Sequence, residues 1–447
     1  MQLVAYGAQD VYLTGQPKVT FFQAVYKRHT NFAMENIQQT VNGTPSASGR
    51  VSVTIARNGD LVGNMYVALI PNPTTVALTS TNTAFDNNWI AERAISAVEL
   101  TIGGQRIDKH YQAWFRLYAE VFLGESDKIN YGKMTSCAQS LSDTSTNKTY
   151  VYLPLLFFFN RNPGLYLPLI ALQYHEVRLD FDLTAYFGSY FGASSPTFEV
   201  WANYVYLDTE ERRRFAQKGH EYLIEQVQHT GGDTLGGTGA NTVRLSFNHP
   251  VKELIWCYQN QSQTNVGNLN GMWNFSTGCS TVNVTCAPQP SILGAALPHL
   301  VGAPHLFSNL QSITLGTGTT SNIYWVEEGT SNTTALSACE VGPLRDFKLI
   351  LNGQDRFKEQ VGKYFNQYQP YVYHTGTPYP GIYVYSFALQ PEEHQPTGTC
   401  NFSRIDNAQV FFNIKTAGSA SLLQKMFAVN YNILRIQSGM GGLAFSN

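Results

Sequence analysis

One short pattern occurs twice in this chain, once in each half of its 447 residues. Residues 100–109 read LTIGGQRIDK and residues 349–358 read LILNGQDRFK, with a leucine, an aliphatic residue, Gly-Gln and a lysine in register. Each copy predicts a strand that ends in a tight turn, because Gly and Asn tolerate the positive φ angles of a two-residue hairpin. The repetition predicts two similar β-domains in tandem.

The rest of the chain supports this division. Its length suits two domains of about 200 residues each, and each half offers about eight short strands at regular spacing, typical of a jelly roll. Thr242–Phe247 and Val251–Tyr258 look like a second copy of Val51–Ile55 and Leu61–Ile70. We therefore expect an all-β protein with an arm at 1–30, jelly roll 1 at 31–207, a helical linker at 208–222, jelly roll 2 at 223–437 with a surface-loop insertion at about 259–340, and a tail at 438–447.

A few local patterns predict elements outside the strands. Tyr111–Leu123 has apolar residues at helical spacing, and Asp208–Phe215 resembles a helix start with a capping box. We also expect two helical turns at Thr20–Arg28, with Thr20 as N-cap. Tyr166–Tyr174 and Tyr371–Tyr373 are predicted as strands.

The composition is poor in charge and rich in aromatic residues. Charged residues make up 13% of the chain, about half of the ~25% usual in soluble domains. Aromatic residues make up another 13%. A surface of this kind suits burial against other subunits, where aromatic side chains are enriched and charges are depleted. An aromatic-rich β core explains the same numbers equally well.

Charge and hydropathy exclude several classes of protein. The net charge is −2 and basic residues form no block, which argues against direct nucleic-acid binding. The first ten residues do not have the pattern of a signal peptide. The longest apolar run, Tyr150–Phe159, falls well short of the ~20 residues that span a bilayer. We expect a soluble protein.

The cysteines do not predict a disulfide scaffold or a zinc site. The six cysteines are sparse and show no paired C-x-x-C spacing. Cys257 and Cys400 lie in strand-like runs and are interpreted as buried thiols, whereas Cys279, Cys286 and Cys339 lie in a loop-rich region where one pair can bridge. A reducing compartment is the favoured interpretation.

No group of residues predicts catalysis or a cofactor. Asp180 and Asp182 share one face of a strand, as a carboxylate pair does, but no third acid or histidine is near in sequence; a rim or turn position is favoured. His175 has no metal-binding spacing and is interpreted as structural. Arg212–Arg214 suit either a phosphate contact or, as favoured, the solvated face of a helix. The glycine-rich stretches have no lysine after the glycine, so they are no phosphate loop.

Seven N-x-[ST] triplets occur in the chain, a number that its abundant Asn, Ser and Thr partly explain by chance. Four of them lie in the 259–340 insertion and are the candidate glycosylation sites, Asn260, Asn274, Asn283 and Asn332. Without a signal peptide they would not meet the secretory machinery. They mark that region as polar and outward-facing with or without sugar.

Nine stretches of the chain resemble the major capsid proteins of nucleocytoplasmic large DNA viruses, algal-virus members most of all. They are Gln2–Thr14, Tyr26–Phe32, Arg57–Leu61, Ile102–His110, Pro168–Val177, Phe247–Pro250, Leu351–Phe357, Gly398–Asn407 and Asn432–Gly442. The resemblance covers nearly the whole chain except the region 259–340.

The resemblance implies a structural protein with a double jelly roll and no enzymatic activity or cofactor. It implies that three chains form a trimer with a near-hexagonal outline, and that these trimers tile an icosahedral shell. Minor capsid proteins and an internal membrane are expected beneath the shell, with the 1–30 arm and the tail facing inward. It also implies a place in the virion capsid, assembled in the host cytoplasm. The alternative is a lectin-like jelly roll that binds carbohydrate.

Overall fold

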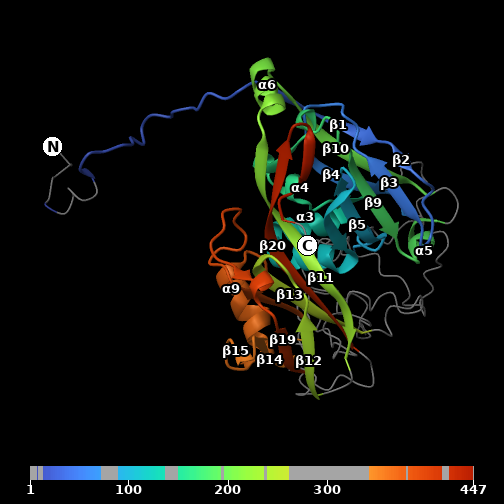
Figure 1. Cartoon of the computed structure of the whole chain (residues 1–447), viewed down its shortest axis with the longest axis vertical. Coiled ribbons are helices and arrows are strands. Elements are labelled where there is room, and N and C mark those ends of the chain that lie inside the picture. Colours follow the sequence, from blue (N-terminus) through green and yellow to red (C-terminus); the bar gives the residue numbers. More distant parts are fainter. Residues whose placement is uncertain are drawn as a thin grey trace, which may run out of the picture.

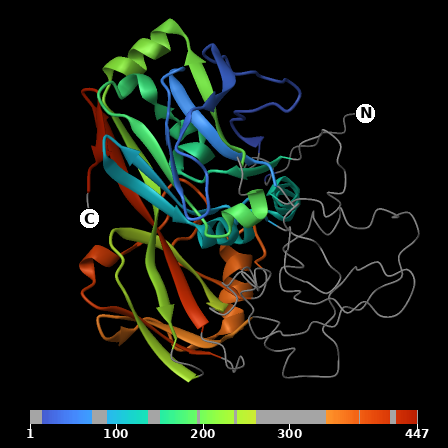
Figure 2. The same cartoon turned by 90° about the vertical axis from the view of Figure 1, so that its right-hand side faces the viewer.

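The computed structural model describes residue 8 and residues 14–71, 89–135, 150–192, 196–235, 239–260, 342–378, 381–414 and 422–445. These residues form four antiparallel sheets, two in each half of the chain. Figures 1 and 2 show the first half stacked on the second along the longest axis of the molecule. We call the half that contains β1 to β10 roll 1 and the half that contains β11 to β21 roll 2.

Roll 1 consists of two sheets that pack face to face. Sheet 1a has the order β1-β10-β4-β7, and the short strand β8 pairs with β4; sheet 1b has the order β2-β3-β9-β5-β6. The bounds are β1 Phe32–Gln39, β2 Val41–Asn42, β3 Arg50–Thr54, β4 Leu61–Leu69, β5 Ile95–Ile102, β6 Gln105–Tyr111, β7 Val151–Pro154, β8 Leu167–Pro168, β9 Val177–Leu183 and β10 Phe198–Leu207.

Roll 2 is built in the same way. Sheet 2a has the order β11-β20-β13-β17, with β18 paired to β13 and β21 to β20; sheet 2b has the order β12-β19-β14-β15, with β16 paired to β14. The bounds are β11 His220–Thr234, β12 Gly239–Leu245, β13 Pro250–Asn260, β14 Leu344–Leu351, β15 Gln354–Asp355, β16 Gln360–Val361, β17 Ile382–Ser386, β18 Cys400–Asn401, β19 Ala408–Ile414, β20 Leu422–Gln437 and β21 Met440–Leu443.

The two rolls share one topology. When the eight principal strands of each roll are numbered along the chain, one sheet has the order 1-8-3-6 and the other has the order 2-7-4-5, in both rolls. This is the wrapping of a jelly roll, which joins two four-stranded sheets by connections that cross between them. The all-β prediction of two tandem jelly rolls is confirmed.

The repeated sequence pattern occupies the same hairpin in both rolls. In roll 1 it joins β5 to β6, with Ile102 paired to Gln105; in roll 2 it joins β14 to β15, with the same two-residue loop. Gly103 and Gly104 have φ of 57° and 81°, and Asn352 and Gly353 have φ of 51° and 78°. Two consecutive left-handed residues are the geometry of a type I′ turn, as the pattern predicts.

Short helices lie in the connections, as expected. Their bounds are α2 Gln112–Phe122, α3 Glu125–Thr135, α4 Phe158–Arg161, α5 Phe187–Phe191, α6 Thr209–Gln217 and α9 Gln369–Tyr373; the π-helical turn η7 covers Tyr364–Tyr368, and 3-10 turns cover Pro163–Leu165, Leu169–Ala171 and Phe402–Arg404. The predicted helix at Tyr111–Leu123 is α2, and the charged segment after Asp208 is α6. Asp208 is the N-cap residue but its side chain makes no capping bond.

Several local predictions are wrong. Thr20–Arg28 has only a turn at 21–23 and is otherwise irregular and exposed, because its apolar side chains lie in solvent and gain no packing that would favour a helix. Tyr371–Tyr373 ends α9 and is not a strand. Of Tyr166–Tyr174, only Leu167–Pro168 is a strand.

Two proposed segment limits also differ from the elements that the structure shows. Within the expected linker 208–222, α6 ends at Gln217 and β11 already begins at His220. The expected tail 438–447 contains β21, which pairs with β20. The type I′-like turn at Ser438 and Gly439, with φ of 54° and 80°, turns the chain back onto the sheet.

The hydrophobic core does not stop at the boundary between the rolls. Alternate residues of β13 face opposite sides: Leu254 and Trp256 belong to the core of roll 2, whereas Ile255 and Cys257 belong to the large core cluster centred on roll 1. The same alternation separates Ala428 from Phe427 on β20. Sheet 2a is thus buried on both faces, which makes the two rolls one packed body.

Candidate assembly surfaces and the junction between the rolls

Helix α2 of roll 1 lies against the outer face of sheet 2a. Its apolar spacing places Trp114 beside Phe427 of β20, with ring centroids 5.6 Å apart. At the end of the helix, Phe122 meets the ring of His374 edge-on at 5.2 Å. Aromatic pairs in such offset or edge-on geometry stabilise a contact beyond the area they bury. This aromatic row joins the rolls.

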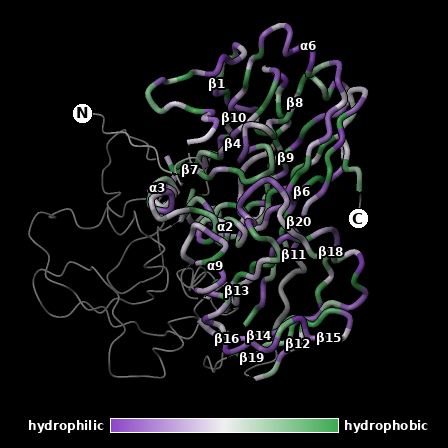
Figure 3. Tube along the Cα trace, turned by 90° about the vertical axis from the view of Figure 1, so that its left-hand side faces the viewer, coloured by the Kyte–Doolittle hydropathy of each residue, from purple (hydrophilic) through white to green (hydrophobic). Residues whose placement is uncertain are grey.

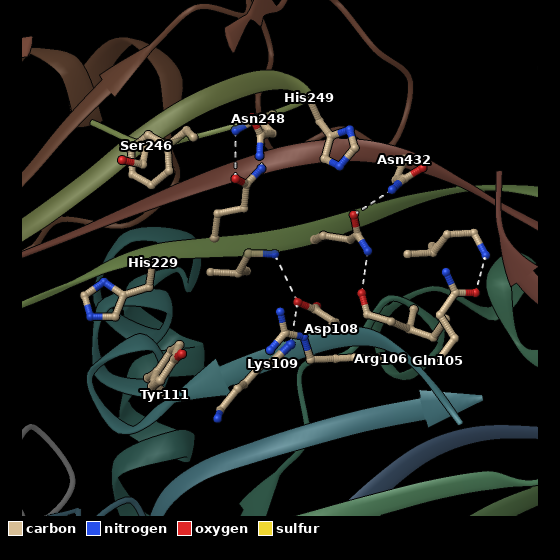
Figure 4. A pocket seen from close by; sticks show the side chains of 16 residues that line it. Gln105, Arg106, Asp108, Lys109, Tyr111, His229, Ser246, Asn248, His249 and Asn432 are labelled. Atoms are coloured by element: carbon tan, nitrogen blue, oxygen red, sulfur yellow. Dashed lines mark hydrogen bonds between the residues drawn. The ribbon is translucent and has the colours of Figure 1, made fainter. Parts of the chain in front are cut away.

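Polar groups complete the junction at its other edge, as Figure 4 shows. The carboxylate of Asp108, on β6, accepts hydrogen bonds from the backbone N–H of Lys109 at 2.9 Å and from that of Val227, on β11, at 3.2 Å. The side chain of Gln226 donates to the carbonyl oxygen of Ile107 and accepts from Asn432 at 3.0 Å. A strand of each roll thus satisfies polar groups of the other.

A cavity of about 460 Å³ lies along this edge. Its wall includes Arg106, Tyr111, His229 and Asn248. Asn248 exchanges backbone hydrogen bonds with the side chain of Gln228, at 2.6 and 2.9 Å. Polar groups of the wall therefore pair with one another, and the cavity is a groove in the junction. Within the described ranges, no three His, Cys, Asp or Glu side chains converge as metal ligands would.

Two buried charge clusters cross or border the junction. Glu225 of roll 2 lies 2.6 Å from Lys252 and 3.1 Å from Arg161 of roll 1. Burial acts to raise the pKa of Glu225, but attraction to the two cations outweighs it, so the pKa lies below the ordinary value. The carboxylate is therefore charged at neutral pH and fixes α4 of roll 1 to β11.

The second cluster surrounds His374. Its Nε2 atom lies 2.9 Å from an oxygen of Glu253 and its Nδ1 atom 3.2 Å from an oxygen of Glu392. Burial acts to lower the pKa of His374, but the two carboxylates outweigh it and raise the pKa to about 9. The imidazole is thus positively charged at neutral pH, directly under Phe122 of roll 1.

The C-terminal hairpin holds the rolls together at the turn of the repeated motif. Leu443 donates its backbone N–H to the side chain of Gln105 at 3.1 Å, and His175 Nδ1 lies 2.9 Å from the carbonyl oxygen of Gly441. The ring of His175 occupies the space where a Cβ on Gly103 would stand, 2.3 Å away. His175 has the structural role that the sequence favours.

The structure pairs the other candidate chemical residues with cations or leaves them on the surface. Asp180 lies 3.3 Å from Arg50 and 2.7 Å from Arg178, and Asp182 lies 3.7 Å from Arg50. These arginines neutralise the two carboxylates, which β9 does place on one face. Arg212 pairs with Asp60 at 3.0 Å, and Figure 3 shows α6 as a mostly hydrophilic helix at the end of the molecule.

The described residues include only some of the predicted cysteine and glycosylation positions. Cys257 is buried and Cys400 is half-buried, and both are free thiols. Burial raises the pKa of Cys257 to about 12. Asn260 is the last residue of β13. Cys279, Cys286 and Cys339, like Asn274, Asn283 and Asn332, lie outside the described residues.

Two of the places where the described residues expose large apolar side chains are the arm and the surface of α9. On the arm, which leaves the body beside α6 (Figure 1), Phe21 and Phe22 are 94% and 99% exposed. On roll 2, Tyr371 of α9 is 86% exposed, and Tyr368 and Val372 are also exposed. Aromatic residues at helical spacing are the sequence signal for this surface, although the residues of Tyr371–Tyr373 taken alone predict a strand. In the described part of the chain, no helix has the length and apolar character to cross a bilayer.

Comparison with known proteins accounts for both halves of the chain. A family model described as the large eukaryotic DNA virus major capsid protein matches residues 211–442, and one described as the major capsid protein N-terminus matches residues 20–208. The chain belongs to this family of major capsid proteins. Its membership confirms a structural, non-enzymatic role in the virus capsid and favours that role over a lectin-like one.

Relatives and solved structures agree with this assignment. The major capsid protein of Paramecium bursaria Chlorella virus 1 is 43% identical over 479 residues, covering 100% of this chain and 99% of the relative. That of Phaeocystis pouchetii virus is 40% identical over 526 residues with the same coverage. A chain of the PBCV-1 virus capsid quasi-atomic model matches with a TM-score of 0.71 and 39% identity, covering 96% of this chain and 100% of that chain. The Faustovirus major capsid protein shares the fold, with a TM-score of 0.65 at 13% identity, covering 97% of this chain and 94% of that chain.

Proposed function

We propose that three copies of this capsid protein close into a trimer whose six jelly rolls give a near-hexagonal outline, and that such trimers tile an icosahedral shell. The observation that carries the proposal is that one chain supplies two rolls of identical strand order fused into one packed body. A three-fold assembly of such chains has six similar sides. One gene product can then meet its neighbours repeatedly by similar contacts.

The trimer is tested by size-exclusion chromatography with light scattering on the purified protein. The expected mass is three times the 49.7 kDa of the chain. A single species of one chain mass at every concentration would contradict the proposal. Microscopy of particles then tests whether the trimers tile a shell.

The surroundings of the shell follow from the same proposal. Minor capsid proteins and an internal membrane lie beneath it, the arm 1–30 and the chain end face inward, and assembly takes place in the host cytoplasm. The exposed apolar arm supports an inward contact, because exposed aromatic side chains are characteristic of protein interfaces. Direct nucleic-acid contact is not expected at a net charge of −2. Cross-linking mass spectrometry of virions tests these neighbours: cross-links from the arm to outward-facing loops would contradict the orientation.

The proposed segments are those of the sequence, arm 1–30, jelly roll 1 at 31–207, linker 208–222, jelly roll 2 at 223–437 and tail 438–447, except that the first strand of jelly roll 2 already begins at His220 and its last strand, β21, lies within the tail. The insertion at about 259–340 is proposed to face outward, and Asn260, Asn274, Asn283 and Asn332 are its candidate glycosylation sites. Glycopeptide mass spectrometry of virion protein tests this. Unmodified peptides at all four positions would refute the glycosylation without touching the capsid role.

A further inference from the structure

The groove at the junction has one wall from each roll. On the roll 1 side, β6 contributes Arg106 and Lys109; on the roll 2 side, the turn between β12 and β13 contributes His249. Figure 4 shows these two walls with strands β11 and β20 between them as a floor. The cavity of about 460 Å³ lies within the ~300–1,000 Å³ typical of small-molecule sites. A ligand that fills it would contact both rolls of one chain.

The lining carries more positive than negative charge. Arg106 makes no hydrogen bond or ion pair with any of the described residues, and the amine of Lys109 lies 3.8 Å from the carboxylate of Glu99. The carboxylate in the lining, Asp108, is buried, accepts from two backbone N–H groups and lies 2.9 Å from Nε2 of His110. Its lone pairs are therefore occupied within the protein. In a chain of net charge −2, this groove is a locally positive site.

The amide side chains of the floor are held in place before any ligand arrives. Asn432 donates to Gln226 at 3.0 Å, and the side chain of Gln228 exchanges hydrogen bonds of 2.6 and 2.9 Å with the backbone of Asn248. Groups that are already ordered lose little conformational freedom when a ligand binds. The floor is therefore preorganised, and the cations of the two walls are the groups left to meet a ligand.

His249 is held in a strained backbone conformation at the rim of this groove. Its φ of 64° lies in the left-handed region, which few residues other than glycine adopt. Two contacts maintain it: the N–H of His249 donates to the hydroxyl of Ser403 at 2.8 Å, and its carbonyl oxygen accepts from the N–H of Phe402 at 3.1 Å. Strained residues of this kind are concentrated at ligand clamps and other functional sites. The strain is thus a second observation, independent of charge, that points to a ligand here.

We propose that the groove binds a small molecule that carries two or more phosphate groups on a polar ring, as an inositol polyphosphate does. The guanidinium fork of Arg106 and the amine of Lys109 are the donors that phosphate oxygens prefer, and His249 offers a third on the opposite wall. Cations on two walls suit phosphates at two positions of one ligand, and the amides between them suit ring hydroxyls. The same chemistry occurs in a free inositol phosphate and in a phosphoinositide headgroup. The site lies within one chain, so it does not depend on the proposed trimer.

Isothermal titration calorimetry of the full chain with inositol hexakisphosphate, at about 0.15 M salt, tests the proposal. The wild-type protein should bind one molecule per chain, and unphosphorylated inositol should not bind. Arg106→Gln and His249→Gly should each weaken binding at least about tenfold, because each removes a donor to phosphate; glycine keeps the backbone conformation at position 249. Arg213→Gln on α6 is the matched control, since it removes an exposed positive charge outside the groove, and it should stay within about twofold. Thermal unfolding establishes that each variant is folded.

Flotation with phosphatidylcholine vesicles that contain a phosphatidylinositol bisphosphate distinguishes the two sources of the ligand. Co-flotation that Arg106→Gln abolishes assigns the site to a lipid headgroup, whereas binding of the soluble compound without co-flotation assigns it to a free molecule. Absence of inositol hexakisphosphate binding to the wild-type protein would overturn the site. An equal loss of affinity in Arg213→Gln would also overturn it, because binding would then be diffuse attraction. A poly-glutamate peptide that binds as tightly as inositol hexakisphosphate would refute the phosphate chemistry. Each of these results would leave the proposed capsid assembly untouched.

Discussion

The buried ion cluster at His374 predicts a specific loss of stability at alkaline pH. The two carboxylates at 2.9 and 3.2 Å raise the pKa of His374 to about 9 in the folded protein, against about 6.5 in an unfolded chain. Folding therefore favours the protonated ring. The stabilisation is complete below about pH 6.5 and is lost as the pH rises through about 9.

Its magnitude follows from the pKa difference. Each factor of ten in proton affinity corresponds to about 1.4 kcal/mol, so the cluster contributes up to about 3 kcal/mol. Between pH 6 and pH 9.5 the wild-type protein should lose most of that amount in its free energy of unfolding, beyond the contribution of other groups. Urea titration followed by tryptophan fluorescence at fixed protein concentration measures the difference.

Removing the carboxylate at 2.9 Å isolates the effect. Glu253→Gln deletes the larger attraction to His374, so its pKa should fall and most of the loss between pH 6 and 9.5 should disappear. Glu221→Gln is the control, because it removes only an exposed ion pair with Arg435. A Glu253→Gln protein that loses as much stability as the wild type over this pH range would refute the reasoning.

Three further predictions concern packing. Gly103→Ala should destabilise the protein by clearly more than the ~1 kcal/mol expected for Gly353→Ala. A Cβ at position 103 meets the ring of His175, whereas a Cβ at position 353 has open space. Equal urea midpoints for the two variants would contradict this prediction. Trp114→Ala should cost about 3–5 kcal/mol and lower the unfolding midpoint of the whole chain, and an unchanged midpoint would show that the junction is not packed as described. Cys257 should resist maleimide in the native protein, since it is buried with a pKa raised to about 12; rapid labelling found by peptide mapping would contradict its burial.

The repeated motif was the most informative part of the sequence because its turn depends on backbone conformation. Positive φ at two consecutive positions favours Gly and Asn, and that preference is visible in the residues themselves. Tertiary contacts decide whether Gly or Asn occupies the first position of the turn. Gly103 faces the ring of His175, whereas Asn352 accepts hydrogen bonds from the backbone of Asp406 and Asn407 at 3.1 and 3.2 Å.

Local sequence patterns predicted the wrong secondary structure where long-range contacts determine the conformation of a segment. Thr20–Arg28 has helical spacing, but a short amphipathic segment without a partner surface gains too little to form a helix. Tyr371–Tyr373 is rich in residues typical of strands, yet it continues the π-helical turn η7 and becomes α9. Neither outcome is visible within a window of ten residues.

The junction between the rolls was not predictable from sequence. The pairing of Glu225 with Arg161 joins residues of different rolls. The contact of Phe122 with His374 joins segments about 250 residues apart. The hydrogen bond from Thr375 to the carbonyl oxygen of Phe122 spans a sequence separation of 253. A buried strand such as β13 gave one clue, because an apolar run without alternation indicates burial on both faces. It did not say what covers the second face.

The central claim is that this two-roll chain is the repeating unit of a shell built from trimers. An electron cryo-microscopy reconstruction of the particle, at a resolution that traces chains, tests it most directly. The account predicts three chains and six jelly rolls around each capsomer axis. A capsomer of five or six complete chains, or one in which the rolls of a chain belong to different capsomers, would contradict it.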